Sequence, residues 1–309
     1  MLTRTAKTLV LIPALALLLP ALPAWGAETA ETVLIRQALE KDRSGMRRGD
    51  AELVASAMAE NFVHYDARGS VDPAGWTIPH EDLASYAGDL ETDLQARRYD
   101  ISRTVTFLHV YKQKALVTTV DSGWVQDRAT EERQPYARTS LWTFRKLDEE
   151  WLATGLVSAL GDSASGPAPA GSAAPEALSS FLMGEAADWT DGDAGGVLDH
   201  FDEEFVGYDS YTSSNPAKLV VIFGNAEEFE EWLRERLSLV DYTVERSVVS
   251  AKLGAGGTEA IAITDETVSV AHRQGTATSE RQRRVVWTLS RRSGAWKVTN
   301  MFLHMKDWK

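Results

Sequence analysis

The sequence contains no cysteine. Disulfides, thiolate nucleophiles and zinc–thiolate sites all need that side chain, so all three are excluded. Only six histidines occur in 309 residues, and no two have the i, i+4 spacing of a helix-borne metal site. A phosphate-cradling glycine loop and a Gly-x-Ser-x-Gly elbow are also missing. We therefore expect neither a bound metal nor a cofactor.

Basic residues are in the minority. The chain has 32 Lys and Arg against 45 Asp and Glu, for a formal net charge of −13. Such a surface repels phosphate backbones, so we do not expect a nucleic-acid partner. Acidity also keeps an exported protein soluble, which is the simpler reading of the charge. The hydrophobic fraction of 44% is enough to build ordinary globular cores.

The N-terminal segment has the pattern of a secretory signal peptide. Arg4 and Lys7 precede an apolar run over residues 8–22, and small residues precede a cleavage point before Ala27. An uncleaved membrane anchor is the alternative, but the run is short for a span of about 20 residues. We predict a cleaved signal over residues 1–26, a periplasmic or secreted protein, and no membrane contact after cleavage.

Two stretches of the chain repeat each other. GDAELVASAMAENFVHYD at 49–66 returns as GDAGGVLDHFDEEFVGYD at 192–209, an offset of 143 residues. A second match joins residues 138–154 to residues 283–299 at an offset of 145. Matches that keep their order over such a distance indicate a duplicated domain, because solenoid repeats have much shorter periods.

The predicted layout is a domain over residues 27–160 and a second domain over residues 176–309. Between them, residues 161–175 are rich in Gly, Ser, Ala and Pro. This composition cannot form a core, so we interpret the segment as a flexible linker.

Each half is predicted to contain three helices followed by a sheet. In the first half, helical spacing of apolar residues covers 30–47, a short segment after Gly49, and 80–96, with a loop before the third helix. Strand patterns cover residues 62–66, 99–110, 114–126, 135–146 and 150–159. The second half repeats this order.

A family resemblance rests on the repeated residues. They are Gly49-Asp50-Ala51, the segment 60–66 and Leu141-Trp142-Thr143-Phe144 with Trp151, then Gly192-Asp193-Ala194, the segment 203–209 and Val286-Trp287-Thr288 with Trp296. This pattern resembles the nuclear transport factor 2-like superfamily, in its SnoaL-like or DUF4440-like branch. The resemblance implies an α+β fold of two tandem cone-shaped domains, each with three helices packed on a curved antiparallel sheet. Because the superfamily includes enzymes, binders and assembly modules, it leaves the chemistry open.

Asp66 and its copy Asp209 are the candidate catalytic residues. Their position is similar to the strand end where ketosteroid isomerases carry a general base, and a carboxylate in an apolar cone has a raised pKa. The isomerase phenol corresponds to Asp42 and Glu185, and its second acid falls near Ser140, so those partners are missing. The alternative is that both aspartates bind backbone amides where a strand meets a loop.

A second set combines an acid, an arginine and a tryptophan in each half. Strand alternation suggests that each set lines a pocket and fixes a carbonyl or carboxylate ligand. The alternative is a structural ion pair near the rim of the sheet. The members are Asp121, Arg138 and Trp142 in the first half and Glu266, Arg283 and Trp287 in the second.

Tyr65, Tyr208 and His64 complete the candidate ligand-binding residues. The tyrosines fall on the strand face opposite the aspartates, where they pack between layers or contact a ligand. His64 could meet His80 in the first cone, and it is replaced by Gly207 in the copy. A packing or surface role is the default for a histidine in this position.

Three functional hypotheses follow. In the first, the protein is exported and binds a small apolar or amphipathic molecule in a conical cavity. In the second, it is a proton-transfer or hydration enzyme of isomerase, cyclase or hydrolase type that uses Asp66, Asp209 or both. In the third, it is an interaction or assembly module, whose halves pack as an internal pseudo-dimer or whose chains form a homodimer.

Overall fold

The computed structural model describes residues 29–70, 72–161, 175–210 and 219–303. The predicted signal segment, 1–26, lies outside these ranges, as do residues 162–174 of the predicted linker. Within the described ranges, no helix is both long enough and apolar enough to cross a membrane.

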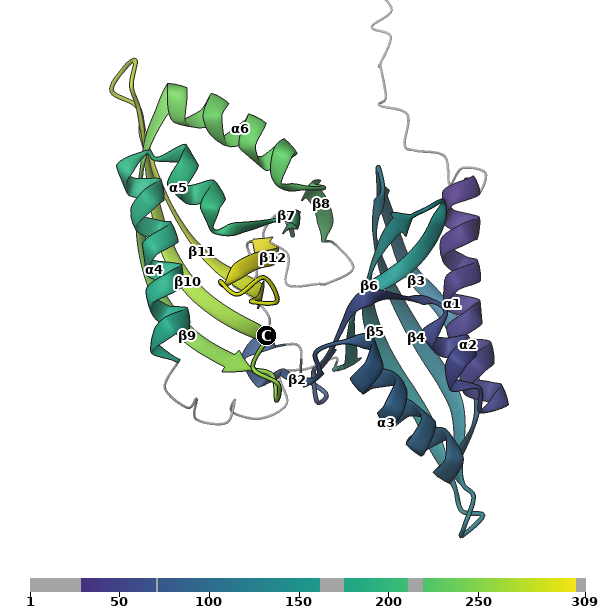
Figure 1. The fold of residues 1–309 in the computed structure, drawn as a ribbon. Coiled ribbons are helices and arrows are strands. Elements are labelled where there is room, and N and C mark those ends of the chain that lie inside the picture. Colours follow the sequence, from purple (N-terminus) through teal and green to yellow (C-terminus); the bar gives the residue numbers. More distant parts are fainter. Residues whose placement is uncertain (1–28, 71, 162–174, 211–218, 304–309) are drawn as a thin grey trace, which may run out of the picture.

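The two halves have the same order of elements (Figure 1). The first domain consists of α1 (Ala30–Arg48), α2 (Ala51–Ala55), β1 (Met58–Asp66), the short 3-10 helix η1 (Pro73–Gly75), β2 (Thr77–His80), α3 (Leu83–Ala96), β3 (Arg97–Tyr111), β4 (Lys114–Asp127), β5 (Arg133–Leu147) and β6 (Glu150–Leu160). The second consists of α4 (Glu176–Asp191), α5 (Ala194–Asp199), β7 (Phe201–Asp209), β8 (Val220–Phe223), α6 (Ala226–Leu239), β9 (Val240–Leu253), β10 (Glu259–His272), β11 (Thr278–Ser290) and β12 (Lys297–Leu303).

Each domain has one six-stranded sheet. The strand orders are β2-β1-β6-β5-β4-β3 and β8-β7-β12-β11-β10-β9. The predicted α+β fold of two tandem domains is therefore confirmed. The sheets are mixed rather than wholly antiparallel, because β6 returns alongside β1, and β12 alongside β7, in parallel pairs.

The segment before the third helix differs from the sequence prediction in both domains, since each has an edge strand there, β2 or β8. Residues 77–80 form the edge strand β2 rather than a loop, and His80 belongs to this strand instead of opening the third helix. An edge strand tolerates Pro79, since a proline without an N–H needs no ladder partner there. The helix begins after Asp82, whose Oδ1 accepts a hydrogen bond from the Ser85 N–H at 2.7 Å.

The repeated Gly-Asp pair sets the first helix boundary in both domains. Gly49 ends α1 with φ 72°, and Gly192 ends α4 with φ 69°. Only glycine adopts this left-handed conformation without steric cost. Asp50 and Asp193 then cap α2 and α5 by accepting a hydrogen bond from a backbone N–H of the first turn.

Helices cover one face of each sheet and form that domain's own core (Figure 1). In the first domain this core includes Phe62, Trp142 and Trp151. In the second it includes Phe229 and Trp287. The strand alternation predicted from the sequence is present, since Phe62 points to the helices while Val63 and Tyr65 belong to the opposite face.

The opposite sheet faces meet each other. A third apolar cluster combines Val63 and Tyr65 of the first domain with Val206, Tyr208 and Phe302 of the second. Burying these side chains stabilises the two-domain arrangement, at roughly 1.5–3 kcal/mol for each large residue. The domains therefore dock sheet to sheet within one chain.

Charged groups hold both ends of this interface. At one end, Arg145 of β5 and Lys114 of β4 bind Glu204 of β7. At the other end, the buried Glu81 carboxylate accepts the backbone N–H groups of Gly257 and Thr258 at 2.9 and 2.8 Å. Burial acts to raise the pKa of Glu81, but the hydrogen bonds from Thr258 and Gly257 outweigh it and hold that pKa below its usual value.

We predict that Glu81→Gln loosens domain docking in a pH-dependent way. The folded state lowers the pKa of Glu81, so its stabilisation is present above about pH 4.5 and disappears as the pH falls further. Chemical denaturation at pH 7 should show a loss of about 1–3 kcal/mol in the free energy of unfolding, and this loss should shrink below pH 4. Exposed Glu132→Gln is the control. Equal effects of both variants at pH 7 would contradict the assignment.

Candidate functional site

A buried arginine lies at the centre of the first cone. Arg103, on β3, binds Asp121 through two hydrogen bonds of 2.7 Å and binds Asp42 of α1 at 2.6 Å. Its guanidinium lies over the Trp142 ring, 5.1 Å from the centroid, and the Trp142 Nε1–H donates to Thr119. The arginine thus ties the first helix to two strands.

The second cone repeats this arrangement. Arg246 binds Glu185 of α4 at 2.6 Å and Glu266 of β10 at 2.7 Å. It lies over the Trp287 ring at 4.7 Å. Arg283 also binds Glu266, at 2.7 Å. Burial acts to raise the pKa of Glu266, but Arg283 and Arg246 outweigh it and hold that pKa below its usual value.

These networks alter the interpretation of the predicted acid–arginine pairs. In the second domain Glu266 and Arg283 do form an ion pair. In the first domain Asp121 binds Arg103 instead of Arg138. The central arginine was missed from the sequence, although it recurs at the offset of 143 together with Asp42 and Glu185. That recurrence was the available signal.

Arg138 is left with weak partners. Its Nη1 is 3.4 Å from the Tyr136 hydroxyl, and its Nη2 is 3.5 Å from His64 Nε2. Its Nε is buried and has no hydrogen-bond partner among the residues that the structure describes. A buried donor without a partner costs about 1–3 kcal/mol, so its presence here calls for an explanation.

His64 lies beside this arginine and joins a chain of polar side chains. Its Nε2 is 2.7 Å from Ser158 Oγ, and its Nδ1 is 2.9 Å from His80 Nδ1. His80 Nε2 is in turn 2.9 Å from the Asp89 carboxylate. The structure therefore brings His64 and His80 together and adds Ser158 and Asp89, two residues that the sequence did not single out.

The second cone contains a cavity of about 590 Å³. Its walls include the predicted residues Asp209 and Arg283, together with Arg236 of α6 and Arg281 of β11. Most of the remaining wall is apolar. These apolar and aromatic residues are Trp189, Ile222, Phe223, Phe229, Trp232, Tyr242, Val244, Val268, Val270, Met301 and Leu303.

The two candidate catalytic aspartates have different surroundings. Asp66 is half-buried at the end of β1, and its Oδ1 accepts a hydrogen bond from the Arg68 N–H at 2.9 Å. This is the local strand-to-loop contact that the alternative reading describes. Asp209 is half-buried as well, and it lines the second-cone cavity. A role in catalysis stays a prediction for both.

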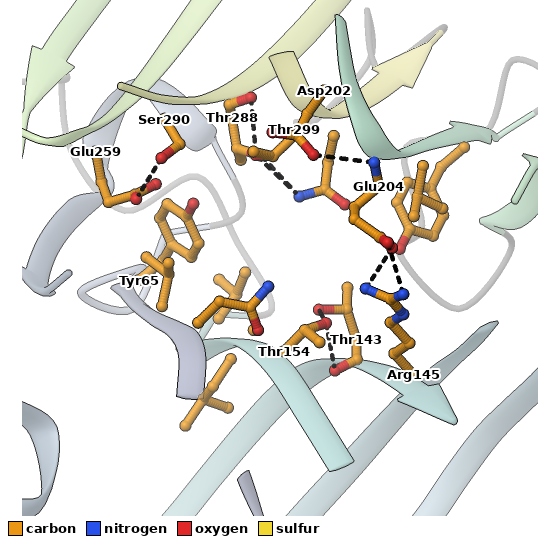
Figure 2. A pocket seen from close by; sticks show the side chains of 18 of the residues that line it. Tyr65, Thr143, Arg145, Thr154, Asp202, Glu204, Glu259, Thr288, Ser290 and Thr299 are labelled. Atoms are coloured by element: carbon orange, nitrogen blue, oxygen red, sulfur yellow. Dashed lines mark hydrogen bonds and ion pairs between the residues drawn. The ribbon is translucent and has the colours of Figure 1, made fainter. Parts of the chain in front are cut away.

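Tyr65 and Tyr208 lie between the domains and not in either cone. Both are buried, and both line a second cavity, of about 240 Å³, between the two sheets. Figure 2 shows Thr143 and Thr154 on one side of this cavity and Thr288 and Thr299 on the other. The threonines of each pair bond each other at 3.1 and 2.8 Å, so their hydroxyl groups are already satisfied. These partners indicate an interdomain packing surface.

Metal binding finds no support in the described ranges. No group of three or more His, Asp or Glu side chains there could hold a metal ion. The two-histidine chain of the first cone has only one carboxylate, Asp89, and its ring nitrogens are used in hydrogen bonds.

We predict that Arg103→Met strongly destabilises the first domain. Removing the guanidinium leaves Asp42 and Asp121 buried without their charge partner, which costs about 3–5 kcal/mol. Chemical denaturation measures the loss, and the triple change Asp42→Asn, Arg103→Met, Asp121→Asn should recover part of it. Arg284→Met, which removes a partly exposed ion pair with Asp265, is the control and should cost under about 1 kcal/mol. A loss of that small size for Arg103→Met would refute a central role.

The solved structures that are similar to this chain have low sequence identity with it. No protein-family model and no curated protein sequence matches the chain. Among solved structures, a ketosteroid isomerase-like protein from Erwinia carotovora atroseptica shows 16% identity and a TM-score of 0.36, covering 42% of this chain and 95% of its own. A nuclear transport factor 2-like protein of unknown function from Shewanella baltica has 11% identity and a TM-score of 0.33, and the match covers 43% of this chain and 95% of that protein. A second such protein, from Shewanella oneidensis, has 12% identity and a TM-score of 0.33, and the match covers 41% of this chain and 98% of that protein.

Each of these structures spans less than half of the chain, which is the length of one domain. The chain itself holds two six-stranded sheets, each covered by three helices. This is an α+β fold of two tandem domains.

Proposed function

We propose that the protein binds a small amphipathic molecule in the cone of its second domain, with an anionic group of the ligand at the arginines. The observation that carries this proposal is the cavity of about 590 Å³, whose wall combines eleven apolar or aromatic residues with seven charged or polar ones. Ligand-binding cavities commonly have about 300–1,000 Å³ and this kind of lining.

The body of the ligand would rest on aromatic side chains. Trp189 and Phe229 come from α4 and α6, Phe223 from the edge strand, and Trp232 from the next turn of α6. The rings pack against each other, with Trp189 and Trp232 centroids 6.2 Å apart and Phe223 and Trp232 centroids 5.3 Å apart. A wall that is already packed can accept an apolar body with little rearrangement.

The arginines in and beside the cavity differ in how many protein groups they already bind. Arg283 binds Glu266, and Arg246 binds both Glu266 and Glu185, the latter a residue of the cavity wall. Arg236 is half-buried and donates to the Tyr242 hydroxyl at 3.4 Å, and Arg281 is exposed. These last two arginines come from the helix and the sheet, and together they favour a carboxylate or sulfonate over a neutral head group.

Export is part of the proposal. The N-terminal pattern predicts a cleaved signal, so the site would meet its ligand in the periplasm or outside the cell. A binder in that compartment needs no cofactor, since its work is to hold a molecule. The apolar part of the wall supports ligand binding. If the site also has acid–base activity, Asp209, which lines the same cavity, is the residue that would carry it.

We predict that Arg236→Gln weakens binding of an anionic probe selectively. Anilinonaphthalene sulfonate and uncharged phenylnaphthylamine share their ring system, and both fluoresce more strongly in an apolar site. The variant should bind the sulfonate about tenfold more weakly, because about 1.4 kcal/mol of charge-assisted bonding is lost. It should bind the neutral probe as the unchanged protein does. Fluorescence titration measures both.

Arg234→Gln is the matched control. Arg234 is on the same helix but points outward to Glu230, so this change should leave both titrations unchanged. If neither probe is bound, or if the two variants weaken the sulfonate equally, the second cone is not the binding site.

A further inference from the structure

Four equivalent positions are polar in the first cone and apolar or glycine in the second. In the strand register, His64 pairs with His80 in the first domain, whereas Gly207 pairs with Phe223 in the second. Likewise Ser158 lies beside Asp66, and Leu303 beside Asp209. The fourth position, at the offset of 143, holds Asp89 in the first domain and Trp232 in the second. These positions belong to the apolar part of the cavity region in the second domain, and in the first domain they form a chain of hydrogen-bonded polar side chains.

This polar chain runs from the interior to the surface. Ser158 is 1% exposed and His64 is 8% exposed, while the Asp89 side chain is 81% exposed. The two histidine rings are parallel, 5.2 Å apart, and the Tyr86 ring packs edge-on against both. Each link measures 2.7–2.9 Å, which is the length of a good hydrogen bond.

The donors of the chain can be assigned from chemistry. Arginine can only donate, and Arg138 Nη2 faces His64 Nε2 at 3.5 Å, which favours the tautomer with that nitrogen unprotonated. Ser158 then donates its hydroxyl proton to the same nitrogen. His64 therefore carries its proton on Nδ1 and donates it to His80 Nδ1, and His80 donates from Nε2 to Asp89. Every link points in the same direction, from Ser158 to solvent.

Arg138 lies beside the polar chain and, among the described residues, has a free donor for an anionic group. Its counterpart Arg283 binds Glu266, but in the first cone Arg103 already occupies the equivalent Asp121. The Nε of Arg138 consequently has no partner within the described residues, and its other contacts are the long ones to Tyr136 and His64. A guanidinium held in this way is suited to an oxyanion.

We propose that the first domain carries an acid–base site for a small oxyanion-bearing substrate, such as a carboxylic acid, in which Arg138 holds the oxyanion and His64 takes a proton. The proton moves along the chain as a balanced relay. Ser158 gives its hydroxyl proton to His64 Nε2 and takes one from the substrate. His64 passes its Nδ1 proton to His80, and His80 releases its Nε2 proton through Asp89 to solvent. The substrate anion left behind is paired with Arg138.

Anion binding and proton uptake should be linked in this site. Burial, and then the charges of Arg138 and His80, hold the pKa of His64 well below its usual value. An anion on Arg138 cancels one of these charges and so favours the protonated ring. The groups facing His64 are Arg138, His80, Ser158 and Tyr86, so no carboxylate opposes this effect directly. This site is in the other domain from the proposed binding cavity and does not depend on it.

The test uses the ring-nitrogen NMR signals of His64 in the whole protein, identified by their loss in His64→Gln. In the unchanged protein we expect the Nδ1–H form, with Nε2 unprotonated. Acetate should shift these signals and move the His64 titration to higher pH, and it should bind at least tenfold more tightly than uncharged acetamide. Arg138→Gln should abolish the acetate response, whereas Arg133→Gln, an exposed position on the same strand, should retain it.

A second variant tests the positioning role of His80. His80→Phe introduces the residue that the second domain has at this position, and it removes the acceptor of the His64 Nδ1–H. We expect His64 to shift toward the Nε2–H form in this variant. An Nε2–H form in the unchanged protein, equal binding of acetate and acetamide, or an acetate response that survives Arg138→Gln would each overturn the proposal. The first two outcomes are measured on the unchanged protein, with His64→Gln used only to assign the signals, so they remain decisive if Arg138→Gln or His80→Phe fails to fold.

Discussion

A buried arginine between two carboxylates is the interaction on which each domain depends. Arg103 joins Asp42 on the first helix to Asp121 on the sheet, and Arg246 joins Glu185 to Glu266. Each guanidinium also lies over a buried tryptophan. Because isolated charges are costly in an interior, the set is stable only when complete. It therefore fixes the helix against the sheet in each domain.

Both domains share this arginine–carboxylate network, but the residues next to it differ between them. The second cone has apolar side chains and glycine where the first has histidine, serine and aspartate. The wall of the second cone leaves a cavity that suits an amphipathic ligand. In the first cone the polar side chains bond one another, and the Arg138 Nε–H has no partner among the described residues. Under the two proposals, one chain combines a ligand-binding site in the second domain with a proton-transfer site in the first.

The second constraint is the face of each curved sheet that its own helices do not cover. A sheet face rich in Val, Tyr and Ile cannot remain in water without cost, and here the two domains cover each other's faces. Ion pairs at Glu204 and hydrogen bonds to Glu81 fix the relative orientation. Tyr65 and Tyr208 belong to this contact, and they occupy the same position in the two copies of the repeated segment.

The sequence by itself determined the duplication, the α+β fold and the strand faces, because these depend on local periodicity, capping residues and repeated spacing. It also identified Asp121, Glu266 and the tryptophans as a set. Only the tertiary structure decided that Arg103 and Arg246 complete these sets, that Arg138 is left over, and that Ser158, 94 residues away, meets His64. Such contacts join strands far apart in the chain, and a pattern within one strand gives a side chain's face but not its partner across the sheet.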